Sequence, residues 1–85
     1  MPTILFIHGW RFFLYFNERN EPPHIHAKKG DSECKFWLHS ERFDIEEAYL
    51  YNMNPADTRL VRQIIFENFD DFVSEYLAYQ RGERK

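Results

Sequence analysis

The sequence places two histidines two positions apart, directly after a pair of prolines, in Pro22-Pro23-His24-Ile25-His26. Side chains at positions i and i+2 of a strand project from the same face of a sheet, so His24 and His26 would lie side by side. Imidazole titrates near neutral pH, and such a pair could act as general acid and base or as two metal ligands. The alternative is that both rings lie on a solvated sheet face and have no chemical role. Because Ile25 between them would point to the core, we expect replacement of either histidine to barely affect folding.

The residues that follow predict a hairpin that carries this pair. Gly30-Asp31 is a two-residue turn signal between strands expected over residues 24–29 and 32–39. Pairing across the turn sets His26 opposite Lys35 and His24 opposite Trp37. Lys28 falls on the same face, whereas Ile25, Ala27, Cys34, Phe36 and Leu38 fall on the other. Cations beside an aromatic plane suit contacts with phosphates and bases.

A metal centre is a weaker interpretation of the same residues. Zinc needs four protein ligands, or three and a water. The candidates are His24, His26, His39, Glu33 and Cys34, but Cys34 is expected on the opposite face as a small buried hydrophobe. The chain has no Cys-x-x-Cys to complete the set, so we expect no metal and no cofactor.

The elements that position these residues are strands followed by helix. Apolar runs over residues 3–7 and 11–16, separated by His8-Gly9, predict two further strands, and the second is apolar on both faces, as in a central strand. Residues 43–51 fit either strand or helix. Asn54 is a good helix N-cap, and Pro55 follows it at the first helical position. Asn68 could cap a second helix, so the sequence is compatible with either one long helix or two shorter ones.

Length and composition agree with this α+β interpretation, a small antiparallel sheet packed by one or two C-terminal helices. The 85 residues, with 19% aromatics and a single cysteine, indicate one domain over residues 1–85. The net charge of −3 gives little bulk attraction to nucleic acid, but a local patch around Lys28, Lys29 and Lys35 remains open. The first apolar run is too short for a signal peptide or a membrane span, so we expect a cytoplasmic protein.

Several of these segments resemble a known bacterial family. Met1-Pro2-Thr3-Ile4, the 11–16 strand, residues 20–27 with their lysine-glycine turn, and helical residues 60–79 are similar to the numbered domain of unknown function four-one-six-zero. The resemblance implies a toxin-like component of a toxin–antitoxin pair, whose partner is a cognate small antitoxin encoded by an adjacent gene. His24 and His26 are the family's motif residues. The first half is richer in phenylalanine than is typical of the family.

Residues and resemblance together lead to one functional hypothesis and its alternatives. We expect a toxin-like effector of a type II toxin–antitoxin module that acts on RNA or translation. As a metal-independent ribonuclease it would use His24 and His26 as acid and base. Substrate contacts are expected from Arg11, Lys28, Lys35 and Trp37. The alternatives are a non-catalytic module that binds protein or nucleic acid, and a small metal-binding protein.

Overall fold

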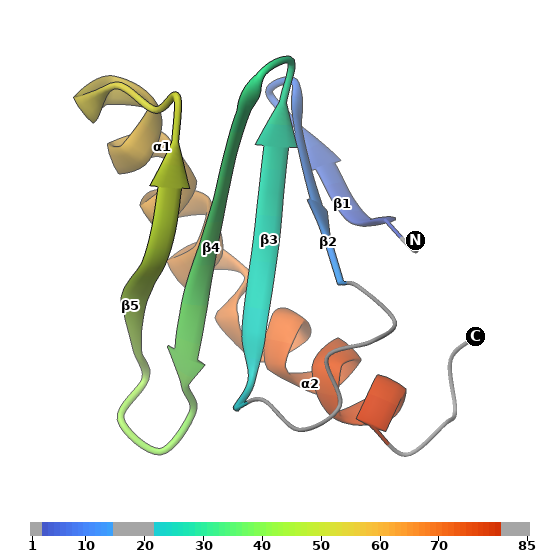
Figure 1. Cartoon of the computed structure of the whole chain (residues 1–85). Coiled ribbons are helices and arrows are strands. Elements are labelled where there is room, and N and C mark those ends of the chain that lie inside the picture. The colour runs from blue at the N-terminus through green and yellow to red at the C-terminus, as the bar shows by residue number, and fades with distance from the viewer. Residues whose placement is uncertain (1–2, 15–21, 81–85) are drawn as a thin grey trace.

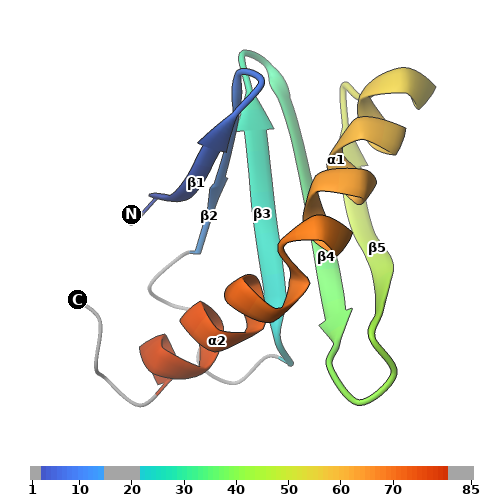
Figure 2. The ribbon, with the colours of Figure 1, turned by 180° about the vertical axis from the view of Figure 1, so that it is seen from behind.

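The computed structural model describes residues 3–14 and 22–80 and shows one sheet with two helices behind it (Figure 1). Five antiparallel strands lie in the order of the sequence. They are β1 (Thr3–Ile7), β2 (Trp10–Phe13), β3 (His24–Lys29), β4 (Ser32–His39) and β5 (Asp44–Tyr51). The helices α1 (Pro55–Glu67) and α2 (Phe69–Gln80) cross the same face of the sheet, which the reverse view makes plain (Figure 2). The predicted α+β class is confirmed.

Tight turns set the strand registers. His8 and Gly9 join β1 to β2 with φ angles of 53° and 82°, and two consecutive positive φ angles are the mark of a type I′ hairpin turn. Gly30, with φ 57°, begins the turn between β3 and β4. Across that turn His26 pairs with Lys35 and His24 with Trp37. The predicted register of this hairpin is therefore confirmed.

Strand β2 is shorter than the sequence predicted. It ends at Phe13 instead of continuing to residue 16, and residues 15–16 lie outside the described part of the chain. Phe12 and Phe13 are both fully buried although they point to opposite faces. This two-sided burial is what the apolar pattern of the segment indicated.

The ambiguous segment 43–51 forms strand β5, and that strand contains a β-bulge. Lys35 pairs with Tyr49, whereas the next residue of β4, Phe36, pairs with Glu47, so Ala48 is the extra residue. A bulge reverses the alternation of side chains beyond it. Tyr49 therefore lies on the same face as Lys35, away from the helices.

Two helices, not one, follow the sheet. Asn54 caps α1 through its side-chain oxygen, which accepts a 2.7 Å hydrogen bond from the backbone N–H of Asp57. Asn68 ends α1, where its Nδ2 donates to the carbonyl of Ile64 at 2.9 Å. None of the described helices is long and apolar enough to cross a membrane.

The core lies between the helices and one face of the sheet. Phe12 of β2 stacks on Phe72 of α2, with ring centroids 5.4 Å apart. The strands contribute to this layer the side chains of Trp10, Phe12, Ile25, Ala27, Cys34, Phe36, Leu38 and Ile45. Burial raises the pKa of the Cys34 thiol to about 12, so it is a neutral, unreactive group near pH 7. The interpretation of Cys34 as a buried hydrophobe is confirmed.

Candidate functional site

The sheet face opposite α1 and α2, here called the open face, carries the residues singled out in the sequence. Because the strands pair in register, its side chains form rows that run across the sheet. The rows are Phe6-Arg11-Lys28-Glu33-Tyr51, Phe13-His26-Lys35-Tyr49 and His24-Trp37-Glu46. The predicted site residues thus all lie on one face, and the histidines occupy its middle strand.

The ring of His24 is oriented by the proline segment that precedes it. Its Nδ1 lies 2.8 Å from the carbonyl oxygen of Pro22. A carbonyl can only accept, so Nδ1 carries the proton and the neutral ring has its lone pair on Nε2. The carbonyl of Pro23 accepts a 2.8 Å hydrogen bond from the backbone N–H of Leu38, which ties this segment to β4. The paired prolines therefore hold His24 in one tautomer and one orientation.

The ring of His26 is oriented by a hydrogen-bonded chain of side chains. The Tyr49 hydroxyl donates to Oε2 of Glu33 at 2.9 Å, and the hydroxyl oxygen of Tyr49 also lies 3.4 Å from Nδ1 of His26. Because the single phenolic proton is directed at Glu33, Nδ1 of His26 is the donor in the longer contact. The neutral His26 ring then also has its lone pair on Nε2. A base held by a third group is typical of catalytic sites.

Both histidines are buried, which corrects the expectation that they would lie on a solvated face. His24 is 1% exposed and His26 is 2% exposed. The two rings meet edge to face with centroids 5.4 Å apart, and Phe13 stacks on His26 at 5.5 Å. Replacing either ring leaves buried polar partners behind, which typically costs ~1–3 kcal/mol. The surface position on which the expectation of barely affected folding rested is therefore contradicted, and we expect these substitutions to destabilise the protein.

The predicted cations lie beside aromatic rings or at the accessible end of the face. The Lys35 ammonium sits 4.4 Å from the centre of the Trp37 ring, and the guanidinium of Arg11 lies 4.9 Å from that of Phe13. Lys28 is exposed and is the strand partner of Arg11. Lys35 and Trp37 thus adjoin the histidines directly, while Arg11 and Lys28 form a second basic position one row away.

Sequence reasoning missed the part that Tyr49 and Glu33 play here. Glu33 was considered only as a metal ligand, and Tyr49 lies in the segment that could not be assigned. Strict alternation from the buried Ile45 would have placed Tyr49 on the helix side, and only the bulge at Ala48 brings it to the open face. No residue in this segment is of a type that predicts the bulge.

The candidate metal ligands are not brought together. Across residues 3–14 and 22–80, no group of three or more His, Cys, Asp or Glu side chains is placed to hold an ion. Nε2 of His39 lies 2.9 Å from Oε1 of Glu46 at the end of the sheet, and Cys34 faces the core.

One comparison with known proteins gave a match. The family model described as "Domain of unknown function (DUF4160)" matches residues 9–76, which include the Pro-Pro-His-x-His segment, strands β2 to β5 and most of α2. No curated protein and no solved structure matches the chain.

Proposed function

We propose a function for this chain, which belongs to the DUF4160 family, from the chemistry of its open face. The protein is a toxin-like effector of a bacterial type II toxin–antitoxin module. It acts in the cytoplasm on RNA, either free or in the translation machinery. The toxin role follows the family resemblance, and the choice of RNA follows the side chains of the open face.

The observation that carries the RNA proposal is the pairing of cations with accessible aromatic rings on this face. Tyr49 is 41% exposed, Tyr51 65% and Phe6 69%, and Trp37 is partly exposed beside Lys35. Proteins hold single-stranded RNA by stacking bases on such rings and by contacting phosphates with lysine and arginine. The open face supplies both kinds of contact within two neighbouring rows.

The charge distribution favours the same face. The helices carry five acids, Asp57, Glu67, Asp70, Asp71 and Glu75, against two basic residues, Arg59 and Arg62. On the open face, β2 to β4 carry three basic residues, Arg11, Lys28 and Lys35, and one acid, Glu33, whereas β5 carries the acids Asp44 and Glu46. We therefore place the RNA backbone over β2 to β4, despite the net charge of −3.

Metal-independent RNA cleavage is the second candidate, and the matching tautomers of the two histidines favour it. One Nε2 would accept the proton of a 2′-hydroxyl as its oxygen attacks the adjacent phosphorus. The other imidazole, protonated, would donate to the departing 5′-oxygen, which leaves a 2′,3′-cyclic phosphate and a 5′-hydroxyl. Lys35, opposite His26, would stabilise the charge on the phosphorane. We rank cleavage after binding because both rings are buried. RNA can reach them only if the side chains that cover them move aside.

The toxin role is tested by growth. We expect bacteria that express this chain alone to stop growing, and we expect growth to resume when the small protein encoded by the adjacent gene is co-expressed. The two proteins should then co-purify as one complex by size-exclusion chromatography and mass analysis. Normal growth with the chain alone, at a level of soluble protein confirmed by immunoblot, would refute the toxin role.

RNA binding is tested by removing one stacking ring. Stacking contributes ~1–3 kcal/mol per base, so Trp37→Ala should weaken binding of a fluorescein-labelled single-stranded RNA by ~5–150-fold in an anisotropy titration. Lys28→Ala should reduce the slope of log binding constant against log salt concentration by about 1, as expected for the loss of one phosphate contact. Leu77→Ala, an exposed apolar position on α2, is the matched control and should bind like the parent. Equal affinity of the Trp37 and Leu77 variants would argue against the open face.

A further inference from the structure

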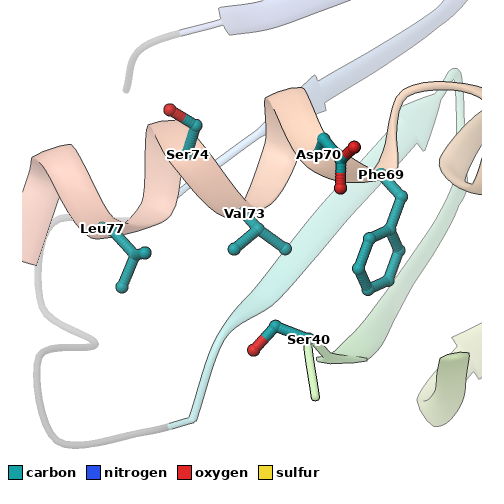
Figure 3. Close-up of a pocket in the computed structure, with 6 residues that line it drawn as sticks. All are labelled: Ser40, Phe69, Asp70, Val73, Ser74 and Leu77. Carbon is teal, nitrogen blue, oxygen red and sulfur yellow. The ribbon is translucent and has the colours of Figure 1, made fainter. Parts of the chain in front are cut away.

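A groove runs along α2 on the side of the molecule away from the open face. Its first part, about 260 Å³, lies between α2 and the loop that joins β4 to β5 (Figure 3). The residues lining this part are Ser40, Phe69, Asp70, Val73, Ser74 and Leu77. A second part, about 310 Å³, continues past the start of α2 and shares Phe69 and Asp70 with the first.

The wall of the groove is an apolar stripe. Phe69, Val73 and Leu77 recur every four residues, and Figure 3 shows all three side chains on the side of α2 where Ser40 lies. Leu77 is 43% exposed at one end of the groove. At the other end the ring of Phe43 is 54% exposed, although it lies 4.6 Å from that of Phe69.

Phe43 is held in a conformation that bulky residues seldom adopt. Its φ of 52° lies in the left-handed region, where glycine and asparagine are the usual residues. Such a conformation is strained for a residue with a bulky side chain, and strained residues gather at binding sites. A large aromatic ring that is exposed at a strained position is typical of a surface that binds another molecule.

The charge around the groove identifies the kind of molecule. Of the residues that line its two parts, Glu67, Asp70 and Asp71 are acidic and none is basic. Arg42, in the same loop as Phe43, follows the acidic Glu41 in sequence and does not reverse this balance. An apolar stripe bordered by carboxylates is complementary to apolar side chains flanked by lysine or arginine.

We infer that this groove binds a basic amphipathic helix of a partner protein. A helix fits because the stripe on α2 repeats every four residues, the spacing at which the ridges of one helix pack into the grooves of another. The inference is independent of the RNA proposal, because the groove and the open face lie on opposite sides of the sheet. Both surfaces can be occupied at the same time.

The inference is tested with designed peptides and the full ¹⁵N-labelled chain. The probe is a helical peptide of about five turns with leucines on one face and lysines on the other, compared with a copy that has glutamates in place of lysines. We expect backbone amide shifts to change at Ser40, Phe43 and residues 66–77, and the lysine peptide to bind at least ~10-fold more tightly in low salt. Changes concentrated on the open face, or equal binding of both peptides, would overturn the inference.

Substitutions in the groove provide the second measurement. Leu77→Ser should weaken binding of the lysine peptide by about 5-fold or more, because it removes accessible apolar surface. Asp70→Asn combined with Asp71→Asn should weaken it and reduce its salt dependence. Asp31→Asn, an exposed acid in the β3–β4 turn, is the control and should bind like the parent. With thermal melts confirming that the variants fold, unchanged affinity in both groove variants would refute this site.

Discussion

If the chain acts by the second candidate mechanism, metal-independent cleavage, its RNA cleavage should fall by ~10²–10⁴-fold when His26 is replaced by glutamine. Glutamine keeps a hydrogen-bonding group near Tyr49 but cannot take up and release a proton near neutral pH. The assay is the release of 2′,3′-cyclic phosphate ends from a single-stranded RNA. His24→Gln should be nearly as damaging, because the reaction needs one group for each proton transfer.

His39 is the matched control for this experiment. It lies on the same face, but at the end of the sheet, with its side chain 26% exposed and paired with Glu46. His39→Gln should therefore cleave like the parent. If His26→Gln is folded at the assay temperature and cleaves as fast as the parent, His26 has no part in acid–base chemistry. The non-catalytic alternative predicts no cleavage by the parent, and growth arrest that depends on Trp37 and Lys28 more than on either histidine.

Replacing Ile25 with alanine is expected to lower the free energy of unfolding by ~2–5 kcal/mol. Ile25 is fully buried in the layer between β3 and the helices, so the substitution leaves a cavity. The total free energy of unfolding of a small domain is only ~5–15 kcal/mol, so this loss should be evident in a urea titration. Lys28→Ala, at an exposed position of the same strand, should stay within ~0.5 kcal/mol.

Substitution of either buried histidine should lower the free energy of unfolding by an amount between those expected for Ile25→Ala and Lys28→Ala. Their removal leaves polar groups without partners, at ~1–3 kcal/mol, but opens less of the core than loss of Ile25. The expected order of destabilisation along β3 is thus Ile25, then His24 and His26, then Lys28. An Ile25→Ala variant as stable as Lys28→Ala would contradict the assignment of the core face.

The sequence was most informative where local rules act alone. A two-residue turn and strict alternation determine the β3–β4 register, so the partners of His24 and His26 could be predicted residue by residue. Asn54 and Pro55 likewise mark the start of α1, because capping depends on the backbone groups of a single turn. Such features need no knowledge of distant parts of the chain.

The sequence was least informative where distant residues decide. Glu46, Glu47 and Ala48 favour helix by intrinsic propensity, yet pairing with β4 makes this segment a strand. Alternation of side chains showed which face the two histidines share. It did not show that neighbouring side chains bury them there, since burial depends on residues from several elements. The hydrogen-bonded chain from Glu33 through Tyr49 to His26 could not be predicted for the same reason.

The order of the strands has a consequence for how the protein is made. Every strand pairs only with its neighbours along the chain, so the sheet can assemble progressively as it leaves the ribosome. The helices that cover its apolar face are synthesised after all five strands. During that interval Ile25, Phe36 and Leu38 have no cover, which is when a nascent chain is most prone to aggregate or to engage a chaperone.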